Sequence, residues 1–338
     1  ILYGWVYKEK QPANEFDNIE ISLIIAAKNE IKNLKKNLPN WLQQAHPNFK
    51  IIIVDDHSTD GTYEFVQEYN DERVLALRNK YGCGKKQALR TGILHAKTDF
   101  MVFIDADVHI DSTNFLNCYV EQFALGKDLI LGYSYYPKSK GLLNTFIRYE
   151  TFRTASSYFS FALIGKPYMG VGRNLGFTKT LFEKAEGYKI HSNIPMGDDD
   201  LFVQSVAHFA NVACLLNKSS FTNSPPQKTW KTYKNQKIRH LQAGKFYRLN
   251  NLILLGLVQI GFTLFWGVFL FGILKHLDKF WMPGFFVLFI IHQTIKDKFD
   301  LLRSKKFLYL WPFLEYLWIL YVWYFDFLSW FNKKVEWK

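Results

Sequence analysis

Three consecutive aspartates, Asp198, Asp199 and Asp200, stand in the stretch MGDDDLF at 196–202. Carboxylates placed this close repel one another, and a neighbouring negative charge raises the pKa of a carboxyl group. A carboxyl group with a raised pKa is a better general base at neutral pH than an ordinary one. A carboxylate at a helix start also favours the helix dipole, which suits Asp200 if a helix begins there. The run therefore predicts acid–base chemistry, and the rest of the chain must indicate which carboxylate performs it.

A second acidic pair, Asp105 and Asp107, stands in FIDADV at 103–108. On a strand these two side chains point to one side and Ala106 points to the other. Mg²⁺ or Mn²⁺ takes one or two carboxylates from a protein and completes its shell with diphosphate oxygens. The pair predicts such a cation site, with a solvated strand end as the alternative.

Two polar stretches are suited to a nucleotide. In VDDHSTDGT at 54–62, Asp56 can accept hydrogen bonds from ribose hydroxyls or a base N–H. Turn and cap chemistry is the alternative there, and we expect Asp60 to cap a helix. In YGCGKKQAL, Lys85 stands at a predicted helix start, where phosphate is favoured. The stretch lacks the G-K-[ST] of a P-loop, and an exposed helix start is its alternative.

The stretch QKIRH at 236–240 places Gln236 and Arg239 on one face of a predicted helix. An arginine there can clamp a diphosphate or stabilise a leaving group. The alternative is a basic stripe that meets anionic lipid, and this interpretation is preferred for Lys237 and Lys245.

The elements that position these residues alternate between strand and helix. Such a pattern predicts an α/β fold with a parallel sheet covered by helices on both faces. Ligands bind such sheets beyond the carboxyl ends of the strands, so the polar stretches should gather on one rim. The predicted strands are 21–27, 49–56, 73–77 and 99–107, and the predicted helices are 29–45, 61–70 and 84–96.

A different composition begins near residue 248. Residues 249–274 carry no charge and are long enough to cross a membrane. Residues 280–295 and 307–331 are further candidate spans, and a buried core helix is the alternative for each. Lysines and arginines crowd the connection 296–306, which by the positive-inside rule places it and the preceding domain in the cytoplasm.

These features predict three regions and a multi-pass protein of the cytoplasmic or inner membrane. Residues 1–18 form an N-terminal segment that could be the end of a membrane helix, 19–247 a catalytic domain, and 248–338 a membrane region. The net charge of +12 favours an anionic partner. Nucleic acid is not the expected partner, because much of the charge flanks the membrane segments and no recognised module is present. Three widely spaced cysteines indicate a reducing compartment.

Taken in order, the motifs resemble those of membrane-anchored family 2 glycosyltransferases with a GT-A, Rossmann-like fold. The resemblance covers about residues 20–245 and rests on the ordered set rather than on any single motif. The motifs are SLIIAAKNE, IIIVDDHSTDGT, GKKQAL, FIDADV, GRNLGFTK, GDDDLF and QKIRH.

The resemblance implies a role for each motif on the donor side. Ala26 and Glu30 match the nucleotide-binding end of the first strand, and Asp56 matches the aspartate that meets the base, usually uracil. Lys85 matches a lysine near the donor. Asp105 and Asp107 match the metal-binding pair. The donor would be a nucleotide-diphosphate sugar, and the cofactor Mg²⁺ or Mn²⁺.

The resemblance also implies the acceptor side. Asp199 matches the catalytic base, with Asp198 as its acidic companion. Arg173 and Asn174 match an acceptor-side segment. Gln236, Arg239 and His240 match Q-x-x-R-W, with His in place of the usual Trp that helps processive synthases position the acceptor.

The implied reaction is an inverting, metal-dependent transfer from a nucleotide-diphosphate sugar to a hydroxyl of a lipid or glycan acceptor at the membrane. A polyprenyl-phosphate glycosyltransferase is a first alternative, which the intact base motif disfavours. A processive polysaccharide synthase is a second, disfavoured by His240. A non-catalytic sugar-nucleotide-binding membrane protein is a third, because the fold alone can bind the donor.

Overall fold

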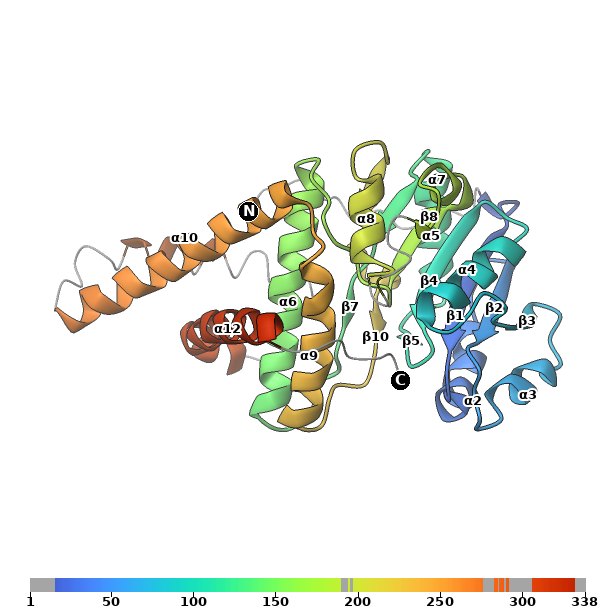
Figure 1. Cartoon of the computed structure of the whole chain (residues 1–338), viewed down its shortest axis with the longest axis horizontal. Coiled ribbons are helices and arrows are strands. Elements are labelled where there is room, and N and C mark those ends of the chain that lie inside the picture. The colour runs from blue at the N-terminus through green and yellow to red at the C-terminus, as the bar shows by residue number, and fades with distance from the viewer. Residues whose placement is uncertain are drawn as a thin grey trace. The chain divides into compact units, whose positions relative to one another are not determined.

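The computed structural model describes residues 16–189, 194, 197–275, 283–284, 286–288, 290–291 and 306–331 (Figure 1). Contacts divide these residues into two compact units. The first unit holds 16–138 and 157–226, and the second holds 139–156 and 227–331. The second unit thus includes residues before 248, where the change in composition places the end of the catalytic domain.

The first unit is built on a seven-stranded sheet in the order β3-β2-β1-β4-β8-β6-β9. The four strands predicted from sequence form, and they pair in parallel. β8 instead runs antiparallel to both β4 and β6. The alternating strand–helix pattern that predicted parallel pairing ends with β4, so the sequence carried no such indication for β8. The strands are β1 (Ile21–Ala27), β2 (Phe49–Asp55), β3 (Val74–Arg78), β4 (Phe100–Asp105), β6 (Leu129–Leu131), β8 (Leu175–Thr178) and β9 (Val212–Cys214).

Helices cover the sheet as the α/β prediction requires (Figure 1). α4 packs so closely on β1 and β2 that a Cβ atom on Gly92 would lie 2.6 Å from the Ile24 side chain. α2 buries Leu34, Leu38 and Trp41 in the core. The helices of this unit are α2 (Ile31–Trp41), α3 (Thr62–Gln67), α4 (Lys85–His95), α5 (Phe115–Ala124), α7 (Lys179–Lys184) and α8 (Asp200–Val206).

A second, three-stranded sheet has the order β5-β10-β7. β10 (Thr222–Asn223) pairs antiparallel with β5 (His109–Ile110) and parallel with β7 (Ser134–Tyr135). Because β5 follows β4 after three residues, this small sheet fixes the chain just beyond the predicted cation pair.

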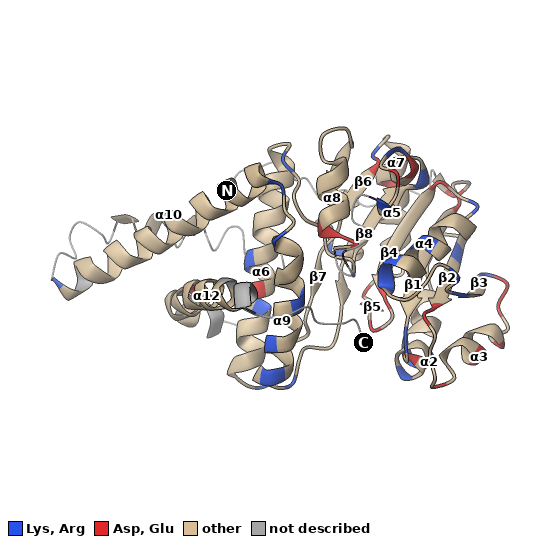
Figure 2. Cartoon of the chain, in the orientation of Figure 1, with Lys and Arg blue, Asp and Glu red and all other residues tan. Residues whose placement is uncertain are grey.

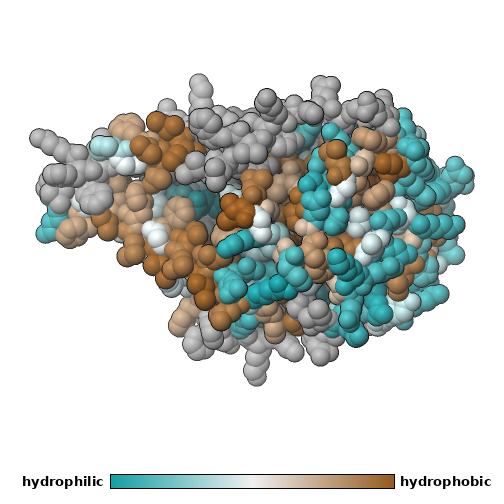
Figure 3. Space-filling view, turned by 90° about the horizontal axis from the view of Figure 1, so that it is seen from above, coloured by the Kyte–Doolittle hydropathy of each residue, from teal (hydrophilic) through white to brown (hydrophobic). Residues whose placement is uncertain are grey.

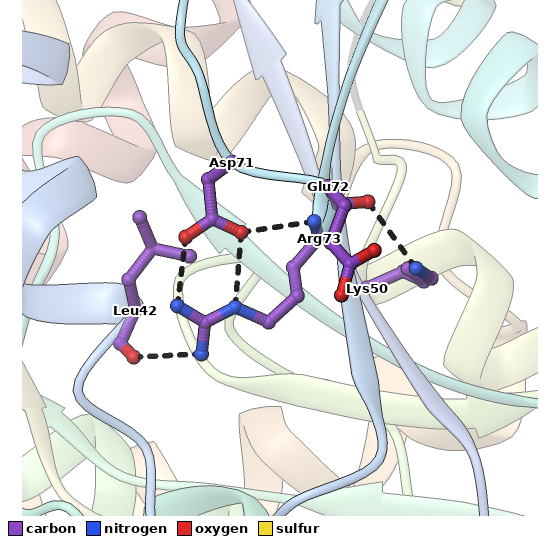
Figure 4. A network of polar contacts seen from close by, with 5 residues as sticks. All are labelled: Leu42, Lys50, Asp71, Glu72 and Arg73. Atoms are coloured by element: carbon purple, nitrogen blue, oxygen red, sulfur yellow. Dashed lines mark hydrogen bonds and ion pairs between the residues drawn. The ribbon is translucent and has the colours of Figure 1, made fainter.

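Polar contacts fix the entry to β3 (Figure 4). The Arg73 guanidinium donates to both carboxylate oxygens of Asp71, at 3.0 and 2.8 Å, and to the Leu42 carbonyl just beyond α2. Lys50 donates to the Glu72 carbonyl. This network ties the start of β3 to the end of α2 and to β2. It lies at the amino ends of the strands, whereas the predicted rim lies at their carboxyl ends.

The second unit contains α9 (Trp230–Gly244), α10 (Leu249–Leu274), α12 (Lys306–Phe331) and the first part of α6 (Leu142–Leu163). Two ion pairs anchor α6 within it. Glu150 pairs with Lys237 of α9 at 2.6 Å, and Arg153 pairs with Glu315 of α12 at 3.7 Å. Lys237 is therefore largely buried, which corrects the interpretation that it meets lipid.

Among the described residues, one helix, Leu249–Gly272, is long and apolar enough to cross a membrane by length and composition. Most of its side chains are exposed, and Figure 3 shows a broad apolar surface at the end where α10 lies. α12 forms over the third predicted span but carries Pro312 and the buried Glu315. Most of the second predicted span, 280–295, and most of the segment 1–18 fall outside the described residues.

Candidate active site

The carboxyl ends of β1, β2 and β4 meet at one edge of the sheet. Ala26 lies beside Val54 on one side and Asp105 on the other, and Ala27 lies beside Asp55. The polar stretches that follow these strands therefore gather on one rim, as the parallel pairing predicted.

The segment that carries Asp105 and Asp107 is held by side chains of α2. Asn37 donates to the Ala106 carbonyl at 3.1 Å, and the Trp41 indole donates to the Val108 carbonyl at 3.0 Å. Burial raises the pKa of Asp107 to about 6, and the charge of Asp105 adds to the effect. The two carboxylates are thus held close to each other with unfavourable mutual repulsion, which a cation would relieve.

Lys85 is the first residue of α4, and its ammonium joins two acidic groups. Its Nζ lies 2.8 Å from Asp105 Oδ1 and 2.9 Å from Asp198 Oδ2. Burial acts to lower the pKa of Lys85, but Asp105, Asp198 and Asp199 outweigh it and hold that pKa well above its usual value. Figure 2 shows the acidic start of α8 that contributes to this cluster. The structure therefore brings the predicted cation pair and the aspartate run to one place.

Asp199 is the N-cap of α8 and not part of the helix itself. Its Oδ1 accepts from the backbone N–H of Asp200, and its Oδ2 accepts from the backbone N–H of Gly172, both at 2.8 Å. Burial raises the pKa of Asp199, and Asp198 raises it further, against the effects of Asp200, Lys85 and Gly172. Asp200 begins the helix, as predicted.

Gly172 lies against this cluster. A Cβ atom at this position would be 3.0 Å from Lys85 Nζ and 3.3 Å from a carboxylate oxygen of each of Asp198 and Asp199. A side chain at this position would thus press on the lysine and on both acids, and the Gly172 backbone reaches Asp199 directly.

Arg173 and Asn174 are neighbours in sequence with different surroundings. The Arg173 guanidinium lies 4.4 Å from the Tyr136 ring centre, its Nη1 has no hydrogen-bond partner among the described residues, and Asp107 and Asp105 are among the charges that raise its pKa. Asn174 is fully buried. Its amide accepts from the Tyr119 hydroxyl and donates to the carbonyls of Tyr133 and Ser220, so it supports the fold and does not face the site.

Glu30 lies on the rim in front of α2. Its carboxylate accepts a hydrogen bond from Asn33, and burial raises its pKa, with Asp105 and Asp60 adding to the effect. Asp60 accepts from the backbone N–H groups of Thr62 and Ile31, which are the first residues of α3 and α2. The predicted cap thus serves two helices.

Asp56 is fully buried, and both its oxygens are engaged. It accepts from the Asn79 side chain at 2.6 Å and from the backbone N–H of Gly84 at 2.9 Å. The neighbouring Asp55 has a buried oxygen, Oδ1, without a partner among the described residues. Asp55 also lines a pocket of about 440 Å³, together with His57, Ser58, Tyr63, Glu64, Arg78 and Asn79.

Gln236, Arg239 and His240 lie on α9 in the second unit. Gln236 and Arg239 are half-buried, and the position of His240 is exposed. The helix predicted from their spacing is confirmed.

The residues at the rim fit a hard divalent cation. Asp105 and Asp107 supply two carboxylates. Burial is the main cause of the raised pKa of Asp107, and the charge of Asp105, whose repulsion such an ion would reduce, adds to it. Among the described residues no three His, Cys, Asp or Glu side chains converge on one point. The protein thus offers part of a coordination shell, which suits an ion that shares its remaining positions with phosphate oxygens.

Sequence reasoning missed three residues beside the acids. Gly172 donates to Asp199, Lys86 donates to the Ile194 carbonyl at 2.9 Å, and Tyr188 packs on Phe202 of α8. The second glycine of GVGRN and the second lysine of GKKQAL are visible in the sequence. Their roles are not, because their contacts join segments that are 27 and 108 residues apart.

Residues 22–184 match the family model described as Glycosyl transferase family 2. Over 97 residues the chain is 32% identical to a UDP-Glc:alpha-D-GlcNAc-diphosphoundecaprenol beta-1,3-glucosyltransferase of Escherichia coli, a match covering 29% of this chain and 39% of that protein. Over 106 residues it is 33% identical to a poly-beta-1,6-N-acetyl-D-glucosamine synthase of Staphylococcus aureus, covering 30% of this chain and 25% of that one. The chain spans less than two fifths of either relative.

Among solved structures, the fold resembles that of a mannosyltransferase of Pyrobaculum calidifontis, in complex with GDP-Man and Mn²⁺. The TM-score is 0.51 at 20% sequence identity, and the match covers 71% of this chain and 69% of that chain.

Proposed function

We propose that this chain is a family 2 glycosyl transferase, whose model residues 22–184 match, and that it transfers a sugar from a UDP-sugar to a hydroxyl group of a lipid-linked or polysaccharide acceptor, with inversion. The observation that supports this most is the single cluster formed by Asp105, Lys85, Asp198 and Asp199. The cluster brings Asp105 and Lys85, which are proposed to bind the cation and the donor diphosphate, next to Asp199, which is proposed to deprotonate the acceptor hydroxyl group.

Asp199 is the proposed general base. Its pKa is raised by burial and by Asp198, which makes it a better proton acceptor at neutral pH than an ordinary aspartate. Two backbone N–H groups fix the orientation of its carboxylate. One base is enough, because an inverting transfer needs a single attack on the face opposite the leaving group.

Asp105 and Asp107 are proposed to hold Mg²⁺ or Mn²⁺ together with the diphosphate. When bound, the ion supplies charge that neutralises the departing nucleoside diphosphate. Lys85 is proposed to place its positive charge near the same oxygens. A positive group there accelerates the reaction because it stabilises the negative charge that develops on the leaving group in the transition state. Arg239 and Gln236 are proposed to bind the diphosphate as well.

The nucleoside is proposed to lie at the ends of β1 and β2, near Ala26, Glu30 and Asp56. Asp56 accepts hydrogen bonds from the Asn79 side chain and the Gly84 N–H, and these bonds fix the position of the loop before Lys85. Asp55 offers the unpaired oxygen at this end, which can accept the N–H of a base.

The acceptor is proposed to be lipid-linked, since α10 is suited to a membrane and one relative is named for a diphosphoundecaprenol-linked acceptor. Arg173 and His240 are proposed to lie on the acceptor side. We propose that the catalytic unit faces the cytoplasm and that more than one segment crosses the membrane, from the basic connection at 296–306.

A processive polysaccharide synthase is the second candidate, favoured by the similarity to the poly-beta-1,6-N-acetyl-D-glucosamine synthase. His240, where processive synthases carry Trp, favours a single transfer. A polyprenyl-phosphate acceptor needs little base catalysis, so the well-positioned Asp199 favours a hydroxyl. A donor panel on purified membranes, with mass spectrometry of the glycosylated lipids, distinguishes these products by the number of sugars added.

The substitution Asp199→Asn tests the proposal. It should abolish transfer while leaving UDP binding intact, because the amide keeps the shape but cannot take a proton. Asp71→Asn is the matched control, since Asp71 pairs with Arg73 away from the rim (Figure 4), and it should keep turnover. Near-normal turnover in Asp199→Asn would contradict the assignment of Asp199 as the general base.

A further inference from the structure

Tyr188 is held rigidly beside the acid cluster. It follows a left-handed pair of residues, Glu186 and Gly187, with φ values of 55° and 62°. The Gly187 N–H donates to the Phe182 carbonyl at 2.8 Å, and a Cβ atom on Gly187 would lie 2.9 Å from the Phe182 ring. The Tyr188 ring packs edge-on against Phe182 at 5.1 Å and Phe202 at 6.0 Å. These contacts hold the ring against α7 and α8.

The hydroxyl group of Tyr188 is buried without a hydrogen bond. The residue is 7% exposed, and no described residue partners its Oη. Two other buried tyrosines of the same unit have hydrogen-bond partners: Tyr158 donates to the Gly132 carbonyl and Tyr168 to Ser157. Buried hydroxyl groups are normally paired, and an unpaired one opposes folding. An unpaired hydroxyl group in this position can be satisfied by a bound ligand.

The Tyr188 side chain lies near the acid cluster. Phe202 lies on α8 three residues after Asp199, and Lys86, next to Lys85, has its Nζ 6.0 Å from the Tyr188 ring centre. Tyr188 thus stands between the starts of α4 and α8. Burial raises the pKa of Tyr188 well above its usual value and Asp198 raises it further, so the hydroxyl group stays protonated and can donate.

We propose that the Tyr188 hydroxyl group forms a hydrogen bond with a hydroxyl group of a substrate sugar held beside Asp198 and Asp199. The inference rests on the proposed glycosyl transfer and adds a substrate-binding residue to it. A neutral phenol suits a neutral sugar hydroxyl, because each can donate and accept. The sugar can belong to the donor or to the acceptor, and both offer the same chemistry.

A purely structural role for Tyr188 makes a different prediction. The Phe182 and Phe202 contacts involve only the ring, which Phe reproduces. If packing were the whole role, Tyr188→Phe would behave as wild type or become slightly more stable. The substitution removes one oxygen atom and nothing else, so it isolates the hydroxyl group.

The test compares Tyr188→Phe with wild type in hydrolysis of UDP-glucose with Mn²⁺ and in transfer to octyl glucoside. One lost hydrogen bond should raise a KM about three- to tenfold, with the melting temperature unchanged or higher. A raised KM for UDP-glucose indicates contact with the donor sugar, and a raised KM for octyl glucoside alone indicates contact with the acceptor sugar. Unchanged values for both would overturn the inference.

Two further measurements separate this inference from the proposed function. Tyr168→Phe removes a hydroxyl group that has a protein partner, so it should lower the melting temperature and leave both KM values unchanged. Equilibrium binding of UDP-glucose, relative to UDP, reports on the donor sugar without turnover. Wild-type protein that binds both but transfers no sugar would refute the proposed function, whereas equal KM values and equal binding in an active Tyr188→Phe variant would refute only the role of Tyr188.

Discussion

At the scale of single residues, Asp198 and Asp199 are neighbours in sequence with separate tasks. Asp198 pairs with Lys85, whereas Asp199 accepts two backbone N–H groups. Only the resemblance brought Asp198 and Asp199 to the site. That the strand end carrying Asp105 lies on the rim could be predicted, because it follows from the parallel sheet. The Asp199 partner Gly172 could not, because that contact depends on how the chain enters the antiparallel strand β8, and no local pattern encodes it.

The substitution Gly172→Ala should lower kcat about ten- to a hundredfold with little change in melting temperature, since small displacements of reacting groups cost this much. The added Cβ would press on Lys85 Nζ and on both acids. Steady-state kinetics at saturating donor and thermal unfolding measure the two effects.

Gly170→Ala is the matched control in the same loop. Its Cβ would lie 2.9 Å from the Leu175 side chain and 3.3 Å from Val203, both apolar. Overpacking of this kind costs about 1–3 kcal/mol of stability, and kcat of the folded enzyme should be kept. Equal losses of kcat in both variants would contradict a specific role for Gly172.

At the scale of elements, the strand–helix alternation predicted the ends of β1 to β4 within two residues and those of their helices within four. The surroundings of single charged residues on the later helices were harder to predict, and Lys237 is an example. Its position beside an apolar run is typical of a lipid-facing lysine, yet Glu150, 87 residues earlier on α6, buries it in an ion pair. Pairing between distant helices leaves no periodic signal.

The substitution Lys237→Met should destabilise the protein by about 3 kcal/mol, because it leaves Glu150 buried without its cation. Thermal unfolding in detergent measures this. The double variant Lys237→Met with Glu150→Leu should recover most of the loss, since apolar residues replace buried pairs well. Lys228→Met, at an exposed position, should have no effect; a loss in Lys237→Met no larger than in this control would show that the pair is not structurally important.

At the scale of the whole molecule, a charge of +12 and an exposed apolar helix belong to one chain. Composition predicted both, because length and the absence of charge define α10 without reference to packing. The division into two units could not be predicted from composition, since α6 starts in one unit and ends in the other. An apolar surface of this length is suited to a hydrocarbon environment.

The double variant Leu257→Asp with Leu264→Asp should increase the fraction of the protein that alkaline extraction releases from the membrane pellet. Both leucines are more than 60% exposed on α10, and each charge costs about 2.5–3.5 kcal/mol at the centre of a membrane helix. Leu125→Asp, equally exposed beyond α5, is the control and should stay in the pellet with wild type. Retention of the double variant would mean that α10 does not hold the protein there.

Lys85 joins Asp105 and Asp198 through one ammonium group, and this has a consequence for the order of events. In the proposed mechanism, a donor diphosphate arriving near Asp105 draws that ammonium toward its own oxygens. Asp198 then loses part of its counterion, and its negative charge acts more fully on Asp199. The base thus strengthens only after the donor is in place. The expected kinetics are therefore ordered, with the nucleotide sugar adding first and the acceptor second.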